Sequence, residues 1–311
     1  MARQFMDRSV YKGMLMSPLK IACAILVPFL WGLQFVVIKL AVAAFPPLFL
    51  LALRFALIAA LLLPFAGLPS RAMLWPVMLV SIFMGGLNFS FAFLGLAHGS
   101  ASVAGVVMQL YTPFAILLAW PLLGERPSMR ILIGVAIAFG GVVLTSGGSS
   151  ASLKWLPTLL ITGSAFSLAV GSILVKRHGP FEPMKLLAWM SLFTVPQVLA
   201  ASAMFEHGQM ASLHAAPAIA WLALLYTILL GGILGFGLWF WLIATSSMSK
   251  VAPYALLQTV FAVASGVVLL GEPLTARLVV GMLICIAGVV LTQRPVARPA
   301  SPVIPALRRQ A

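Results

Sequence analysis

LLGERPSMRILIGVAIAFGGVVLT, residues Leu122–Thr145, occurs a second time in this chain as LLGEPLTARLVVGMLICIAGVVLT, residues Leu269–Thr292. The two stretches align without a gap at an offset of 147 positions and agree at 12 of 24 residues. Shared hydrophobicity alone does not produce that agreement, and an internal repeat defines the architecture of a chain. Each copy closes one apolar run with Leu-Leu-Gly-Glu and then opens the next run. The chain is therefore built from two copies of one unit.

The composition predicts a membrane protein. Of the 311 residues, 62% are hydrophobic and 8% are charged, and the mean hydropathy is +1.13. A soluble domain carries about 25% charged residues. The net charge of +14 resides almost wholly outside the apolar runs, which is typical of membrane topology rather than of nucleic-acid binding. We therefore expect the lipid bilayer and a small-molecule substrate as partners, and no nucleic acid.

The sequence predicts no cofactor, no metal site and no catalytic centre. Cys23 and Cys285 lie inside apolar runs, where we expect small buried side chains rather than a disulfide. Metal-ligand spacings and a Walker sequence for binding phosphate are both missing. The chain is therefore expected to be neither an enzyme nor, by itself, an ATP-driven pump. We expect a monomer, although the sequence leaves dimerisation open.

Ten apolar segments are long enough, or nearly so, to cross a bilayer, which takes about 20 residues. They predict an all-α membrane protein with ten transmembrane helices. The expected spans are 19–41, 47–67, 73–96, 102–122, 129–146, 154–175, 184–205, 216–243, 250–270 and 276–293. The first span lacks a cleavage pattern and is expected to be retained. The predicted parts are a cytoplasmic tail (1–18), a first five-helix repeat (19–146), a second (147–293) and a disordered cytoplasmic tail (294–311).

The basic residues predict how the chain is oriented. If the N-terminus is cytoplasmic, 15 of the 19 basic residues lie on the cytoplasmic side, Arg54 lies within a span, and three lie outside, namely Lys39, Lys154 and Arg277. Cytoplasmic loops carry such an excess, so both termini are expected there. Because each repeat holds five spans, the second repeat is inserted upside down relative to the first. Such inverted-topology repeats are typical of secondary transporters.

The opening run WGLQFVVIKLAVAAFPPLFLLALRF (Trp31–Phe55), together with the two LLGE stretches, resembles the EamA-type exporters of the drug/metabolite transporter superfamily. The resemblance spans about residues 20–293. It implies a bacterial inner-membrane protein with a central cavity lined by the first four helices of each half, and with the fifth helices as peripheral supports. Members of this family include exporters of O-acetylserine and cysteine and of aromatic amino acids. Because substrates differ widely on one fold, the resemblance carries the transporter class only.

The predicted spans hold no acidic residue. All five acids lie in tails or at helix ends, at Asp7, Glu125, Glu182, Glu206 and Glu272. A carboxylate at mid-membrane would point to exchange of protons for cations. Its absence argues against that mechanism and leaves facilitated export down a gradient open. Glu125 and Glu272 each precede a short helix, whose N-terminal dipole we expect them to cap.

Four polar or aromatic residues in the first three spans are candidates for binding substrate, each with a structural alternative. Arg54 either anchors the carboxylate of an amino acid or snorkels toward the headgroups. Trp31 and Gln34 share one helix face, and either stack on and hydrogen-bond a substrate or pack between helices. Asn88 lies in a small-residue face, and is either an interhelical hydrogen-bond partner or a substrate contact.

The fourth, eighth and ninth spans add five further candidates. In the ninth span, Tyr254 and Gln258 fall four residues apart on one face of a continuous helix. The repeat offset maps Gln258 onto Tyr111 in the fourth span, whereas Gln109 lies on a competing face, and the sequence does not decide between the two faces. Trp239 lies on the glycine face of the eighth span, and is expected to help close the cavity.

The sequence favours a secondary active or facilitative exporter of small metabolites. Neutral amino acids with aromatic or sulfur-containing side chains, and their derivatives, are the expected substrates, since an acid-free cavity lined by aromatic and amide groups suits a zwitterion. The two inverted halves are expected to work by alternating access. The alternative is efflux of drugs or organic cations.

Overall fold

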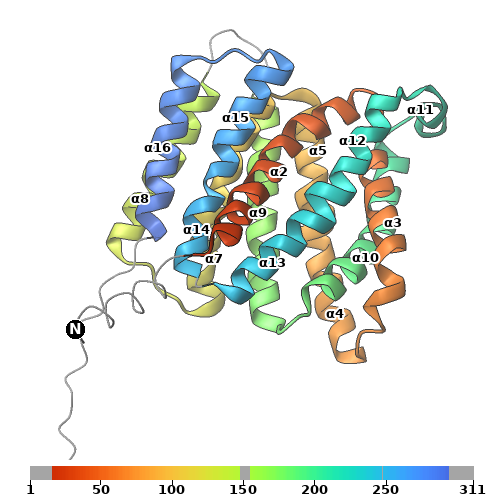
Figure 1. Ribbon diagram of the computed structural model, residues 1–311, viewed down its shortest axis with the longest axis horizontal. Helices are drawn as coiled ribbons and strands as arrows, with labels where there is room; N and C mark the ends of the chain where they lie inside the picture. The colour runs from red at the N-terminus through yellow and green to blue at the C-terminus, as the bar shows by residue number, and fades with distance from the viewer. Residues whose placement is uncertain (1–15, 148–154, 247, 294–311) are drawn as a thin grey trace, which may run out of the picture.

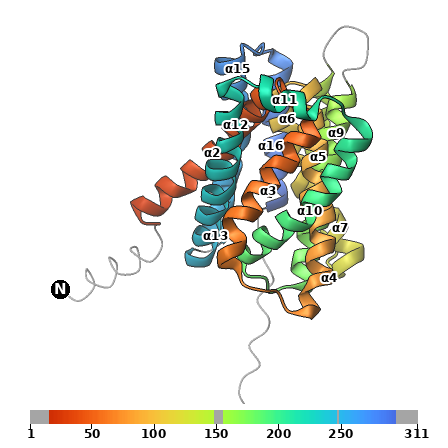
Figure 2. The same cartoon turned by 90° about the vertical axis from the view of Figure 1, so that its right-hand side faces the viewer.

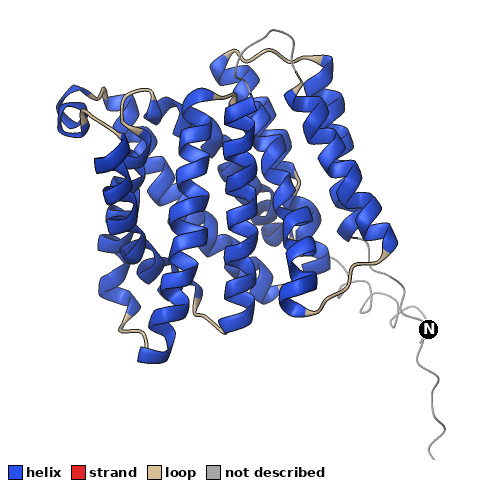
Figure 3. Cartoon of the chain, turned by 180° about the vertical axis from the view of Figure 1, so that it is seen from behind, coloured by secondary structure: helices blue, strands red, loops and turns tan. Residues whose placement is uncertain are grey.

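The computed structural model describes residues 16–147, 155–246 and 248–293. Within these residues all regular structure is helical (Figure 3). Ten of the helices found there are long and apolar enough to cross a membrane, so the predicted all-α fold with ten spans is confirmed. Most of the tail at 1–18 and all of the tail at 294–311 lie outside the described residues, and the prediction of disorder there stays a prediction.

Six of the spans are single helices: α2 (Pro18–Val42), α3 (Pro47–Ala66), α8 (Met129–Ser146), α9 (Trp155–His178), α10 (Pro183–Phe205) and α16 (Ala276–Gln293). The other four are built from two or three pieces: α4 (Arg71–Val80), η1 (Ser81–Leu87) and α5 (Asn88–His98); α6 (Ala101–Val107), η2 (Met108–Leu110) and α7 (Tyr111–Leu123); α12 (Ala218–Ile228), η3 (Leu229–Leu234) and α13 (Gly235–Thr245); α14 (Met248–Ala255) and α15 (Leu257–Leu270). The short helix α11 (Gln209–Ala215) precedes α12.

The third and eighth spans carry a π-helical segment at the same place in the repeat. Both η1 and η3 end at positions that the 147-residue offset superimposes. Each contains a Gly-Gly pair, which tolerates unusual backbone angles. A π-helix weakens the normal backbone ladder, and side chains from the opposite repeat bind the carbonyls: Trp31 Nε1 donates to Gly231 O at 3.0 Å, and Thr194 Oγ1 donates to Ser81 O at 3.4 Å.

The fourth and ninth spans are also interrupted at equivalent places. The 3-10 segment η2 separates α6 from α7, and a turn at Leu256 separates α14 from α15. The expected stripe of Tyr254 and Gln258 crosses this turn, with Tyr254 on α14 and Gln258 on α15. Pro253, three residues before the turn, has no amide hydrogen for the helical ladder.

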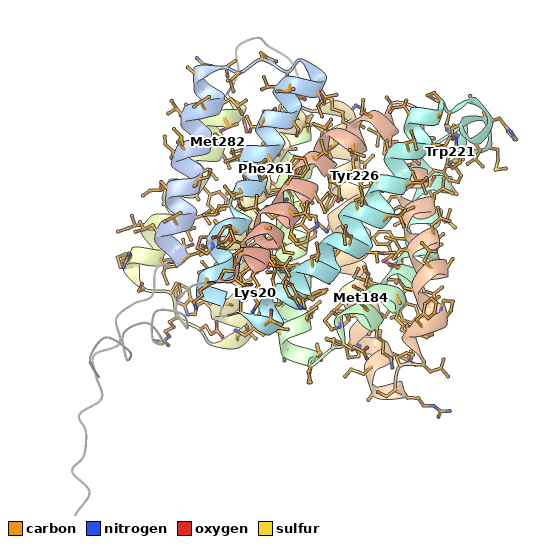
Figure 4. The ribbon with its side chains drawn as sticks, viewed as in Figure 1. Lys20, Met184, Trp221, Tyr226, Phe261 and Met282 are labelled. Carbon is orange, nitrogen blue, oxygen red and sulfur yellow. The ribbon has the colours of Figure 1, made fainter. Side chains whose placement is uncertain are left out.

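The two repeats are interleaved, and most large helix contacts join one repeat to the other. The helix α2 lies between α12 and α15, α3 packs on α10, and α9 packs on both α5 and α7 (Figures 1 and 2). Figure 4 shows Tyr226 of α12 and Phe261 of α15 on either side of α2. At Gly32 a side chain would meet the Gln258 carbonyl oxygen at 2.7 Å. A single rigid half therefore cannot move without sliding along the other.

The fifth helices α8 and α16 lie together at one edge of the bundle (Figure 1). They pack mainly on each other, across the repeat boundary, rather than each on its own half. Glycines permit the approach: a methyl group at Gly141 would lie 2.7 Å from the Gly281 carbonyl oxygen. Small residues allow close backbone packing in a membrane, where apolar contact alone gives helices little reason to associate.

Candidate functional site

The two LLGE stretches lie at opposite ends of the bundle. The α15–α16 loop, with Glu272, is at the top of Figure 1, and the α7–α8 loop, with Glu125, is at the bottom. We call these ends the Glu272 face and the Glu125 face. On each face the glutamate bonds a lysine of the opposite repeat: Glu272 pairs with Lys39 at 3.0 Å, and Glu125 pairs with Lys176 at 2.6 Å. The two ion pairs are related by the repeat.

On the Glu272 face the carboxylate is enclosed by donors of the first repeat. Its oxygens accept hydrogen bonds from Ser100 Oγ at 2.7 Å, from the Ala101 amide at 2.8 Å and from the Ser102 amide at 2.9 Å. Lys39 Nζ also donates to the Gly99 carbonyl at 2.7 Å. Burial alone would raise the pKa of Glu272, but the hydrogen bonds of Ser100, Ser102 and the two amides lower it to about 2.

On the Glu125 face the equivalent pair is open to solvent. The side chains of Lys176 and Glu125 are 60% and 56% exposed, against 31% and 9% for Lys39 and Glu272. An exposed ion pair contributes about 1 kcal/mol or less to the free energy of folding. A carboxylate held by several donors in a half-buried site contributes more, because charged hydrogen bonds are stronger there. The ion pair on the Glu272 face is therefore the more enclosed of the two.

The expectation that each glutamate caps the helix that follows it is wrong for Glu272. It bonds the first amides of α6, a helix of the opposite repeat. The preceding glycine explains why the Glu272 side chain points toward the opposite repeat. Gly271 has a φ of 64° and ends α15 in the left-handed conformation. The chain turns back at that point, so that the next side chain reaches across the repeat boundary.

A third glutamate joins the repeats, and sequence reasoning did not single it out for that role. Glu206, at the end of α10, accepts hydrogen bonds from the amides of Leu48 at 2.7 Å and Phe49 at 2.9 Å. It thereby caps α3 of the first repeat, where Pro47 supplies no amide hydrogen. The groups that donate to its carboxylate oxygens are backbone amides more than 150 positions away in the sequence. Because backbone amides have no sequence signature, no side-chain motif could have indicated this contact.

Arg54 is buried in the interior of the bundle. Its side chain is 1% exposed, and it lies seven residues into α3, about 10 Å from the end of the helix. The guanidinium carbon lies 4.3 Å from the centre of the Phe89 ring and 5.5 Å from that of Phe55. Within the described residues, Nε and Nη1 have no hydrogen-bond partner. The side chain does not snorkel to the surface.

Three candidates form one aromatic cluster toward the Glu125 face. Trp31, Trp239 and Tyr254 all pack on a small core of Ala24, Val27, Leu242 and Val251. The ring centres of Trp31 and Trp239 are 5.6 Å apart. The Trp31 indole also donates to the Gly231 carbonyl, so this residue serves helix packing in the described conformation.

Two candidates belong to a polar network between α5, α7 and α9. Ser164 Oγ donates to Asn88 Oδ1 at 2.8 Å, and Tyr111 Oη donates to Ser172 Oγ at 3.2 Å. Both contacts join the first repeat to α9 of the second. Asn88 Nδ2 also donates to the Met84 carbonyl at 3.1 Å, inside η1. These polar groups are satisfied within the protein.

The three glutamine candidates differ in burial and in partners. Gln34 Oε1 and Gln109 Nε2 are buried and lack a hydrogen-bond partner among the described residues. Gln258 is partly buried on α15, where its backbone contacts α2 at Gly32. Gln34 and Gln109 lie eight residues from the Glu272-face ends of α2 and α6, about 12 Å deep. This is nearly the depth of Arg54, so these three unpartnered side chains share one layer near mid-membrane, whereas the other unpartnered groups of the described residues, Ser128, Ser146 and Ser246, lie at helix ends.

The fold and this layer define a class of protein, a multi-pass membrane transporter built from two repeats. Buried polar groups near mid-membrane, between repeats that contact each other across both faces, are the arrangement by which secondary transporters hold solutes. Comparison with protein-family models gives the family: the EamA-like transporter family matches residues 18–147 and 155–294. The chain belongs to this family, and each match covers one repeat.

Similar proteins are described as transporters. A probable amino-acid metabolite efflux pump of Salmonella typhimurium is 32% identical, over 85% of this chain and 91% of that protein. One of Escherichia coli K12 with the same description is 31% identical, over the same shares. A solved structure with a TM-score of 0.59 covers 88% of this chain and 96% of its own, at 20% identity, which supports the fold. The chain is a small-molecule exporter of the membrane, and its relatives are transporters rather than enzymes.

Proposed function

We propose that the protein exports neutral amino acids and their derivatives, aromatic or sulfur-containing ones in particular, by alternating access between its two repeats. Two relatives described as probable amino-acid metabolite efflux pumps support this substrate class. A zwitterion carries one positive and one negative group, and the mid-membrane layer offers unpartnered groups for both: the Gln34 oxygen as an acceptor, and Arg54 and Gln109 as donors.

One observation carries the mechanism, namely two repeat-related ion pairs of unequal burial. An inverted repeat places equivalent closures on opposite membrane faces. Glu272 is enclosed by Lys39, Ser100 and two amides, whereas Glu125 and its lysine are exposed. In the proposed cycle the two faces exchange these states, so that the enclosed pair opens as the exposed pair closes.

The direction of the cycle follows from the positive charges. The predicted excess of basic residues on the Glu125 side makes that face cytoplasmic and the Glu272 face external. The described conformation is then closed toward the outside, as required for a carrier that takes up its substrate from the cytoplasm. Both termini are cytoplasmic in this orientation.

Efflux of organic cations is the competing function. Arg54 disfavours it, because a buried, unpartnered guanidinium repels a cationic solute in a medium of low dielectric constant. Within the described spans no carboxylate is available to attract one.

Counterflow into proteoliposomes tests the proposal. Vesicles loaded with an unlabelled neutral amino acid should accumulate the labelled one without ATP, and the assay should be run with and without a pH gradient. A dependence on the gradient would identify a secondary active exporter, and its absence a facilitative one. Movement of a quaternary ammonium ion, with none of any amino acid in a broad panel, would establish the competing function instead.

A further inference from the structure

We propose that Arg54 is the binding site for the carboxylate group of the transported solute, so that the carrier selects for carboxylates. The proposal rests on the amino-acid export proposed above and adds the group that is recognised. It is carried by a buried cation whose counter-charge the described protein does not supply.

A lone charge inside a membrane protein is costly unless it is paired. Arg54 is 1% exposed and within the described residues has neither a carboxylate partner nor a partner for Nε or Nη1. The arginine cannot lose its proton in ordinary conditions. Buried charges are normally paired, and an unpaired one in a span marks a functional site by default. The missing anion is therefore expected to arrive with the solute.

Within the part of the chain that the structure describes, two nitrogens of the guanidinium, Nε and Nη1, are left free to donate to a bound solute. The Phe89 ring centre lies 4.3 Å from Cζ, and a cation over an aromatic ring is stabilised there. The N–H donors of a guanidinium form a planar fork that matches the two oxygens of a carboxylate.

A group that can accept from an α-ammonium lies on the neighbouring helix. Gln34, whose side-chain oxygen is unpartnered, fills the space beside Gly231 of η3, and Ile58 lies beside the next residue, Gly232. Ile58 is one turn from Arg54 and on the same face of α3. Gln34 therefore offers an acceptor beside this π-helical segment, and Arg54, one turn along α3 from the residue that contacts the segment, offers donors.

The first test uses the wild-type protein and matched solutes. In counterflow, L-phenylalanine and L-methionine should compete at least about 10-fold better than their amides, as the loss of a charged hydrogen bond implies. Equal competition by acid and amide would overturn the proposal. The comparison distinguishes the two hypotheses, since equal competition leaves amino-acid export intact.

The second test measures binding without transport. Purified protein in detergent should show a higher thermal midpoint with millimolar L-phenylalanine than with its amide, and Arg54→Gln should abolish the difference. Arg277→Gln, at an exposed arginine in the first turn of α16, is the matched control and should retain the difference. If L-phenylalanine stabilises the Arg54→Gln protein as it does the wild type, Arg54 is not the carboxylate site, even if export is observed.

Arg54→Lys keeps the charge but removes the planar fork. We expect it to retain discrimination between acid and amide, with a KM for L-phenylalanine raised by roughly 10-fold and a smaller change in maximal rate. A purely structural arginine would lower the amount of folded protein and leave the discrimination unchanged in the molecules that fold. That second result would overturn the proposal.

Discussion

Glu272 and Glu125 each close the same four-residue sequence, Leu-Leu-Gly-Glu, but their ion pairs lie in different surroundings. One carboxylate bonds a lysine, a serine and two amides of the opposite repeat, and its side chain is 9% exposed. The other bonds a lysine in an open setting and is 56% exposed. The two carboxylates therefore share a sequence motif and differ in burial and, among the described residues, in their hydrogen-bond partners.

In the cycle that we propose, closing one face opens the other, so the two repeat-related ion pairs are not both enclosed at once. The cycle that we propose therefore needs no separate device on each side. The four tests that follow probe the difference between the two faces, beginning with the largest expected effect.

Glu272→Gln should have the largest effect, since it leaves Lys39 half-buried without a counter-ion. We expect the closed state of the Glu272 face to lose about 3 kcal/mol, which is roughly a 100-fold change in population. The measurement is labelling of a single cysteine by an impermeant maleimide added from that face. The cysteine replaces Thr112, at the start of α7 three residues beyond Gln109, in a background without Cys23 and Cys285. Glu125→Gln is the matched control and should change labelling from that face far less. Similar changes for both variants would contradict the comparison.

The acid dependence of stability should distinguish the same two carboxylates. The pKa of Glu272 is lowered from 4.5 to about 2, so its contribution to folding is fully present above pH 4.5 and is lost as pH falls toward 2. The loss should reach about 3 kcal/mol. Thermal midpoints in detergent for wild type and Glu272→Gln should therefore differ by a constant amount between pH 5 and 8, and should nearly converge as the pH falls to about 2. A wild-type advantage that persists at pH 2 would refute the assignment.

Double-mutant cycles should give unequal coupling energies for the two pairs. Lys39→Met with Glu272→Gln should show about 1–2 kcal/mol, and Lys176→Met with Glu125→Gln about 0.5 kcal/mol or less. Thermal unfolding of the purified variants in detergent supplies the values. A stronger coupling at the exposed pair would reverse the comparison.

Salt should produce the smallest effect, and only on the Glu125 face. Exposed charges are screened within about 3 Å at 1 M salt, whereas half-buried pairs are screened much less. The stability difference between wild type and Glu125→Gln should vanish as KCl rises from 0.1 to 1 M, while that for Glu272→Gln should persist. Equal screening of both would mean that Glu272 is as accessible to ions as Glu125.

Much of the fold could be predicted because it depends on local pattern. The apolar runs predicted every span, and the fifth and tenth spans, 129–146 and 276–293, agree with α8 and α16 to the residue. The break at Leu256 could not be predicted, since a helix tolerates one proline in many places and the turn depends on packing against α2. The stripe of Tyr254 and Gln258 crosses this break.

The candidate site was less accessible to prediction. The repeat indicates which residues correspond, but it does not indicate which residues touch. For this reason Glu272 was predicted to cap the helix that follows it, although its carboxylate bonds amides of the opposite repeat. Arg54 stood out in the sequence because a charge in a span is rare, but its burial against Phe89 needed the arrangement of α3 and α5. The backbone partners of Glu206 left no trace in any motif.

The π-helical segments η1 and η3 also bear on where a span can bend. Such wide turns are rare and frequently lie at functional positions of a helix, and here both repeats carry one at the same place. Each receives a hydrogen bond from the opposite repeat, Trp31 to Gly231 and Thr194 to Ser81. In the proposed cycle, bending at either segment would therefore be transmitted directly to the other repeat.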